Sequence, residues 1–188
     1  MLYPKKMSSK KADLIIGISI IISILIGIML FVINKLTSGT IQWAALANSG
    51  IIYIWVTVMY SINKNINIAG HVLIQTIAIS ILTLFVDYEL GFKAWSTSIA
   101  IPIIIIVANI TMLILTIVTY KRYIKYAIYQ IIIILFSMIP IYLMFKGNFV
   151  NNKILSIIAV GVSILNLVIS LIICRKDIKE EIIRKFHI

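Results

Sequence analysis

The segment Asp87–Trp95, which reads DYELGFKAW, joins two long apolar runs and decides the fold. Its two carboxylates, Asp87 and Glu89, are the only ones far from the ends of the chain. The run that follows, Ser96–Tyr120, carries no charged residue. A run of this length and polarity predicts a membrane-spanning helix, because about twenty apolar residues are needed to cross roughly 30 Å of hydrocarbon.

Long apolar runs separated by short polar segments make up the rest of the chain. Apolar residues account for 62% of the 188 residues and charged residues for 12%, a composition outside the range of soluble domains. The runs are continuously apolar, which favours helices over the alternating strands of a membrane barrel. The sequence therefore predicts an all-α membrane protein, a bundle of six transmembrane helices. The six runs are Leu14–Ile33, Ile41–Tyr60, Ile68–Val86, Ser96–Thr119, Tyr126–Phe145 and Ile154–Cys174.

The positions of the lysines and arginines predict how the bundle is oriented. Positive residues are enriched in cytoplasmic loops, and most of the 17 lie on the side of the two termini, so both termini are expected in the cytoplasm. The predicted domains are a basic arm (residues 1–13), the transmembrane domain (14–174) and a basic tail (175–188). The abundance of isoleucine, lysine and asparagine is consistent with a bacterial plasma membrane. The four exceptions, expected outside, are Lys35, Lys93, Lys146 and Lys153.

The net charge of +11 indicates which partners to expect. Basic residues close to the ends of membrane helices attract anionic lipid headgroups, so we expect lipid contacts at the cytoplasmic face and no nucleic acid. In the tail, Ile178, Ile182 and Phe186 recur every four positions, which predicts a short amphipathic helix on the inner membrane surface. Binding of this helix to a protein partner is the alternative.

Two outer segments share a pattern of glycine and tryptophan. Gly39 is followed four positions later by Trp43, and Gly91 by Trp95, while Gly147 has a comparable place in the third outer segment. Glycine at positive φ suits a tight turn, and tryptophan suits the membrane interface. The pattern is typical of three helical hairpins. In the second hairpin we expect an outer loop and interfacial anchor formed by Asp87, Glu89, Gly91 and Trp95.

Small residues form a stripe on the first apolar run, where Ser19, Ser23 and Gly27 recur every four positions. Such a stripe lets two membrane helices approach closely. Two interpretations are open: packing within the bundle against the second or sixth helix, and docking of another membrane protein or a second copy of the chain.

Polar side chains interrupt the apolar runs at positions expected to lie within the membrane. They either fix the helices to one another through amide hydrogen bonds or line a pocket for a weakly polar ligand. His71 shares a helical face with Gln75, where it is either a proton relay or a histidine at the wetted cytoplasmic interface. The amides of the third to sixth runs are expected at one depth. The candidate polar residues are Asn48, His71, Gln75, Asn109, Gln130 and Asn166.

Pro102 precedes Asn109 by seven residues and lies on nearly the same face of the fourth run. Proline has no amide hydrogen, so the carbonyl of Ser98 should lack its helical donor and the helix axis should bend. We therefore expect Pro102 and Asn109 on the interior face.

Nothing in the sequence predicts catalysis. There is no close histidine pair, no cluster of side chains spaced for a metal and no glycine loop for phosphates. Only Asp87 and Glu89 are placed for acid/base work, and a solvated loop explains them better. We expect a non-enzymatic structural or accessory protein that acts through partners, with no cofactor and no metal.

Several short motifs are spread along the chain. They are Tyr3-Pro4, Tyr53-Ile54-Trp55, Asp87 with Gly91 and Trp95, Pro102, Ala108-Asn109, and Arg184-Lys185-Phe186-His187-Ile188. Together they resemble an uncharacterised family of six-helix bacterial membrane proteins of unknown function. The resemblance covers nearly the whole chain and supplies no activity. Members often carry an N-terminal zinc ribbon before the Tyr-Pro pair, and this sequence begins at Met1-Leu2-Tyr3-Pro4, so no role of the ribbon is carried over.

Size and topology are also similar to those of the substrate-binding membrane subunit of energy-coupling-factor vitamin importers. That resemblance implies a ligand pocket lined by the second, fourth and sixth helices. It also implies that Ser19, Ser23 and Gly27 contact a coupling subunit. The first run lacks the alanine spacing of that family.

Overall fold

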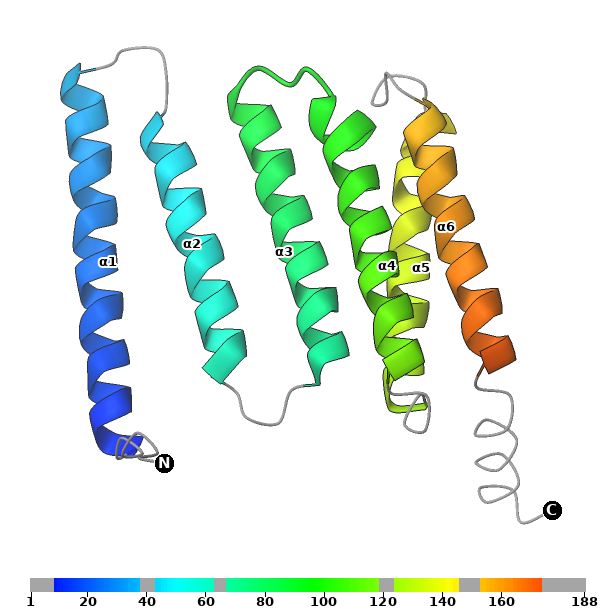
Figure 1. Ribbon diagram of the computed structural model, residues 1–188. Helices are drawn as coiled ribbons and strands as arrows, with labels where there is room; N and C mark the ends of the chain where they lie inside the picture. Colours follow the sequence, from blue (N-terminus) through cyan, green and yellow to red (C-terminus); the bar gives the residue numbers. More distant parts are fainter. Residues whose placement is uncertain (1–8, 38–42, 63–66, 119–123, 146–152, 174–188) are drawn as a thin grey trace. The chain divides into compact units, whose positions relative to one another are not determined.

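The computed structural model contains six α-helices and one π-helical turn, with no strand among the residues that it describes (Figure 1). These residues are 9–37, 43–62, 67–118, 124–145 and 153–173. The predicted all-α class is confirmed, and each helix covers most of the corresponding apolar run. The elements are α1 (Ser9–Thr37), α2 (Trp43–Ile62), α3 (Ile68–Glu89), η1 (Ser96–Ala100), α4 (Ile101–Val118), α5 (Ile124–Phe145) and α6 (Lys153–Ile173).

Five of these helices, as far as the chain is described, are long and apolar enough to cross a membrane. They are α1, α2, α3, η1 together with α4, and α6; α5 contributes a shorter apolar stretch, Ala127–Leu143. Large apolar side chains such as Leu25, Ile110 and Leu165 are exposed on their surfaces. Such exposure suits helices whose solvent is hydrocarbon.

Some predicted features lie outside the described residues. The tail helix with Ile178, Ile182 and Phe186 is one of them, and Gly39 and Gly147 of the proposed hairpin repeat are others.

The chain divides into two compact units, Met1–Ile54 and Trp55–Ile188. In the first unit, asparagine side chains join α1 to α2. Asn34 on α1 accepts a hydrogen bond from the backbone N–H of Ala44 (3.1 Å), and Asn48 on α2 donates to the carbonyls of Gly27 (3.3 Å) and Ala44 (2.8 Å). Gly27 is buried, so at this position the small-residue stripe packs within the chain.

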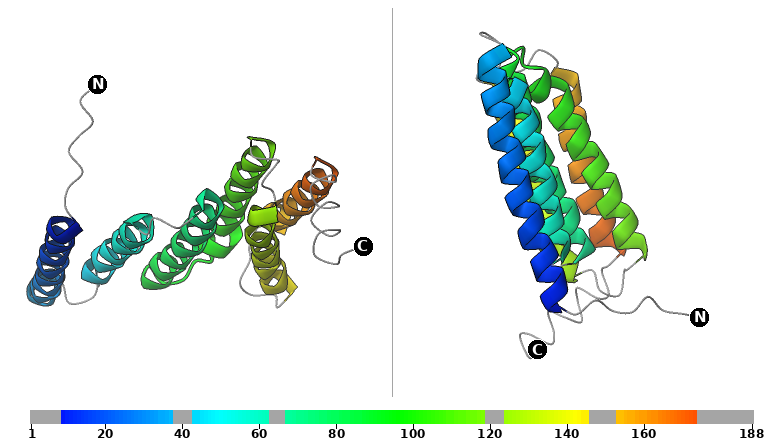
Figure 2. Two further views of the ribbon diagram at one scale, coloured as in Figure 1. Left: turned by 90° about the horizontal axis from the view of Figure 1, so that it is seen from below. Right: turned by 90° about the vertical axis from the view of Figure 1, so that its left-hand side faces the viewer.

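In the second unit, α4 lies between α3 and α6, and α5 packs against all three (Figures 1 and 2). α4 and α6 begin at the same end of the unit and run parallel (Figure 1). One apolar cluster joins α3, α4 and α5, and a second joins α4 to α6 through Ile101, Ile105 and Ala159. The first cluster is formed by Ala69, Leu73, Ala108, Met112 and Ile133.

Gly27→Ala should destabilise the first unit by about 1–3 kcal/mol, because overpacking forces neighbours apart. A Cβ at Gly27 would meet Asn48 Oδ1, and moving that side chain would break its bonds to two carbonyls. The thermal unfolding midpoint in detergent is expected to fall by about 2–4 °C per kcal/mol. Gly17→Ala is the matched control, since a Cβ there meets nothing within 4 Å. Equal midpoints for the two variants would contradict the close approach at Gly27.

Candidate functional site

The outer turn between α3 and η1 is organised by the side chain of Asp87. Asp87 Oδ1 accepts a hydrogen bond from the backbone N–H of Lys93 (3.0 Å). Its Oδ2 accepts two more, from the backbone N–H of Ser96 (3.1 Å) and from Ser96 Oγ (2.7 Å). The carboxylate therefore lies at the N-terminus of the helical segment formed by η1 and α4, where backbone N–H groups and the helix dipole favour a negative charge.

This position corrects the expectation of a solvated loop carboxylate, because Asp87 is the buried residue in the last turn of α3. Glu89, the last residue of α3, is partly exposed instead. Ser96, the main partner of Asp87, was not among the site residues predicted from the sequence. Its signal was available: an acidic residue and a serine flank a glycine turn, and serine commonly begins a helix.

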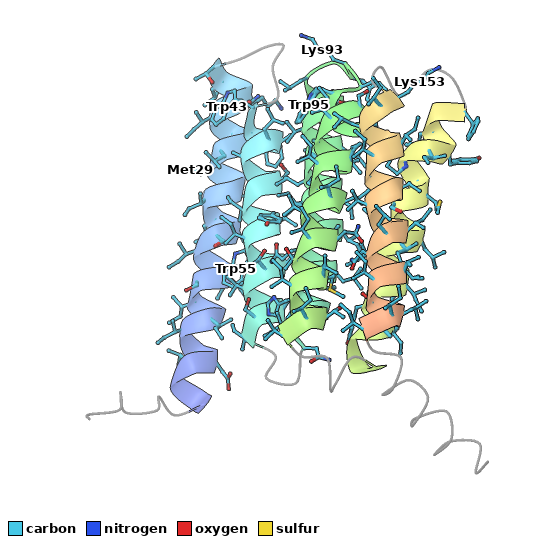
Figure 3. All side chains as sticks on the ribbon, turned by 45° about the vertical axis from the view of Figure 1, so that its right-hand side comes forward. Met29, Trp43, Trp55, Lys93, Trp95 and Lys153 are labelled. Carbon is cyan, nitrogen blue, oxygen red and sulfur yellow. The ribbon has the colours of Figure 1, made fainter. Side chains whose placement is uncertain are left out.

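The same turn contains unusual backbone conformations. Gly91 has φ of 90°, which confirms the predicted positive φ, but Phe92 (46°) and Ala94 (56°) are also positive. For residues with a Cβ such conformations cost about 1–3 kcal/mol each and persist when the surroundings hold them. Here the N–H of Phe92 donates to the backbone carbonyl of Asp87 (2.8 Å). The N–H of Lys93, the next residue, donates to the Asp87 side chain. Lys93 and Trp95 mark this turn in Figure 3, at the same end of the unit as Lys153.

A hydrogen-bonded network lies inside the second unit and joins α4 to α6. Asn109 Nδ2 donates to Ser163 Oγ (2.8 Å) and to the carbonyl of Ile105 (2.9 Å). Asn166 Nδ2 donates to both the carbonyl (2.9 Å) and Oδ1 (3.1 Å) of Asn109. Both asparagines are almost fully buried.

The network continues to α5 through Ser170. Gln130 Nε2 on α5 donates to Ser170 Oγ (2.9 Å), and that hydroxyl donates to Asn166 Oδ1 at 3.4 Å. Three of the predicted polar residues, Asn109, Gln130 and Asn166, are therefore brought together, and serines on α6 complete the connections. The serines were missed as partners of the amides, because serine in a helix commonly bonds to the preceding turn of its own backbone.

The other candidate polar residues have different partners. Gln75 Nε2 donates to Thr57 Oγ1 on α2 (3.0 Å). The ring of His71 meets that of Tyr60 edge-on, with centroids 4.8 Å apart. Asn48 belongs to the first unit, where it binds Gly27. The described bond of Gln75 thus leads to α2, whereas Asn109, Gln130 and Asn166 are joined across α4, α5 and α6. The single layer and the role of His71 stay predictions.

The α4–α6 contact has a regular register. Asn109 meets Ser163 across a separation of 54 residues, and the same separation pairs Ile105 with Ala159, which share an apolar cluster. The buried faces repeat every seven residues on both helices, as in the seam of a coiled coil. One heptad below Asn109 and Ser163 lie Thr116 and Ser170, both buried.

A π-helical turn precedes Pro102. The turn spans η1, and the N–H of Ile101 donates to the carbonyl of Ser96, five residues back. Widening the turn by one residue before the proline relieves the clash that its ring would make in a regular helix. As predicted, Pro102 and Asn109 are both buried on the interior face of α4.

No group of three or more histidine, cysteine, aspartate or glutamate side chains gathers as a metal site within the described ranges. A family model described as a family of unknown function (DUF6320) matches residues 3–188, which include every described helix. No curated protein and no solved structure matches the chain.

Asp87→Asn should destabilise the outer turn by about 1–3 kcal/mol. An amide supplies one acceptor oxygen where the carboxylate supplies two, so at least one buried donor loses its partner. The measurement is the thermal unfolding midpoint of the purified protein in detergent. Glu89→Gln removes the neighbouring charge, two positions away, and is expected to leave the midpoint unchanged. Equal losses from both variants would assign the effect to loop charge and not to the Asp87 bonds.

Proposed function

The chain belongs to this family of unknown function. We propose that it is a six-span integral membrane protein of the bacterial plasma membrane with both termini in the cytoplasm. We further propose that it is a structural or accessory component that acts through partners and is not an enzyme. The observation that carries this proposal is the interior network, in which Asn109, Asn166 and Gln130 bond to other parts of the bundle.

The number of spans is supported by the helices and by the charges. Five helices meet the length and polarity needed to cross a bilayer, and α5 adds a further apolar stretch. α5 must also lie in the bilayer for Gln130 to reach Ser170 on α6. The excess of lysine and arginine on the side of the termini supports their cytoplasmic placement.

A structural role is supported by what the polar side chains do. Each amide in hydrocarbon requires a partner, and a bond between helices contributes on the order of 0.5–2 kcal/mol. The Asn109–Asn166 pair meets this requirement by joining α4 to α6. Asp87, a candidate for acid/base work, accepts bonds from Lys93 and Ser96, and this favours a structural part over a catalytic one.

The proposed partners are anionic lipids at the cytoplasmic face and a second membrane protein or second copy of the chain. The basic arm and tail supply the positive charge for lipid headgroups. On α1, Ser23 Oγ donates to the carbonyl of Ser19 (2.9 Å) and Gly27 contacts Asn48, so the small-residue face favours packing within the chain. The vitamin-importer alternative receives no support from the comparisons or from the described contacts.

Asn166→Leu should lower stability by about 1–2 kcal/mol, because Asn109 would lose the donor to its carbonyl and side-chain oxygens. The expected readout is a lower thermal midpoint in detergent with the helix content retained. Thr111→Val, on the same helix as Asn109, is the control, since the Thr111 hydroxyl bonds to the carbonyl of Val107 in its own helix and partly faces out. An unchanged midpoint, combined with loss of a co-purified small molecule, would contradict the structural role and favour a pocket.

Cysteine labelling in right-side-out membrane vesicles tests the orientation. Cys174 is the single cysteine, so Cys174→Ala combined with Lys93→Cys provides one reporter at the outer turn. A membrane-impermeant maleimide is expected to modify this variant in sealed vesicles, because Lys93 is exposed. In the native chain it should modify Cys174 only after permeabilisation. The reverse pattern would overturn the proposed orientation.

A further inference from the structure

Ser156, in the first turn of α6, has a buried hydroxyl that needs a partner. Within the described part of the chain, Ser156 Oγ is buried and has no hydrogen-bond partner. Other buried serines turn to their own helix; Ser80 Oγ, for example, donates to the carbonyl of Thr76 at 2.7 Å. Ser156 Oγ makes no such bond.

The register of the α4–α6 seam shows what lies opposite this hydroxyl. Ser163 meets Asn109 at a separation of 54 residues, and one heptad towards the outer end the same separation places Ser156 level with Pro102. Ser163 Oγ accepts an amide hydrogen from Asn109 and donates its own hydrogen to the carbonyl of Ala159 (2.8 Å). Pro102 has neither a polar side chain nor an amide hydrogen, so the pairing that works in the middle of the seam fails here.

The backbone beside Pro102 offers acceptors. η1 precedes the proline, packs against α6, and has its first three residues, Ser96, Thr97 and Ser98, almost fully buried. In its π-helical pattern the N–H of Ile101 serves the carbonyl of Ser96, and the next backbone nitrogen belongs to Pro102 and carries no hydrogen. A carbonyl oxygen has two lone pairs, so the carbonyls of η1 can accept a bond from another molecule in addition to those they already make.

We propose that the outer end of the α4–α6 seam binds one water molecule, which accepts the hydrogen of Ser156 Oγ and donates to a backbone carbonyl of η1. Water is the small neutral ligand that combines an acceptor for the hydroxyl hydrogen with a donor for the second lone pair of a carbonyl. A water inserted beside a proline and a widened turn is also a recognised way to complete the hydrogen bonding of an irregular helix. A water-mediated hydrogen bond thus joins the helices at the outer end of the seam, whereas amide hydrogen bonds join them in its middle.

Ser156→Ala tests this site in the full-length protein. If the hydroxyl holds a water that bonds to η1, the variant loses both bonds, and its thermal midpoint in detergent should fall by about 2–4 °C. If the hydroxyl is unpartnered, removing it should leave the midpoint unchanged or raise it. Ser80→Ala is the matched control, a buried serine whose hydroxyl returns to its own helix.

Radiolytic hydroxyl-radical labelling in ¹⁸O-enriched water provides a second readout that a merely structural serine would not change. Bound water should label Pro102 and η1 in the native protein, and Ser156→Ala should reduce that labelling at least about threefold while the exposed Phe92 is labelled as before. Ser156→Thr retains a hydroxyl and should restore it. Unchanged labelling of Pro102 in Ser156→Ala, whatever the change in midpoint, would overturn the proposal, as would a midpoint that stays level or rises.

Discussion

The bond from Asn166 to Asn109 is the interaction on which the second unit depends. Hydrocarbon supplies no hydrogen-bonding partner, so an amide inside the bilayer has to find one on another helix or on its own backbone. One amide nitrogen of Asn166 serves both the carbonyl and the side-chain oxygen of Asn109, while Asn109 uses its own nitrogen on Ser163. These contacts fix the rotation of α4 and α6 and also their relative height. A slide of one heptad would place Asn109 beside Ser156 or Ser170 and leave Asn166 without the same acceptors.

Much of the helical architecture is predictable from the sequence because it depends on one quantity, the length of the apolar runs. Asn109, Gln130 and Asn166 could also be named in advance, since polar residues are rare in such runs and are placed where they find partners. Their partners are harder to predict. Seven-residue spacing shows which side chains share a face, but the register between α4 and α6 depends on packing of residues such as Ile105 and Ala159.

The side-chain partners that could not be predicted share a physical cause. Asp87 is expected in water because a carboxylate next to a turn is usually solvated, and its burial depends on three donors that exist only once the turn is closed. The described bond of Gln75 leads to Thr57 on α2, because that is the direction in which its side chain points. Neither the composition nor the periodicity of the sequence predicts how α3 is rotated about its own axis. The π-helical turn before Pro102 likewise depends on how the closed turn enters α4.

The two sets of bonds differ in when they can form during synthesis. The Asp87 bonds span up to nine residues, so the turn between α3 and α4 can close as soon as Ser96 has left the ribosome. The Asn109–Asn166 bonds span 57 residues, which at roughly 5–20 residues per second corresponds to about 3–11 s of synthesis. During that interval Asn109 is already in the membrane or at the insertion machinery, while its partners on α6 have not yet been synthesised. A slow ribosome or a delayed last helix would prolong the exposure of this amide, so the order of helix insertion becomes part of how the chain reaches its fold.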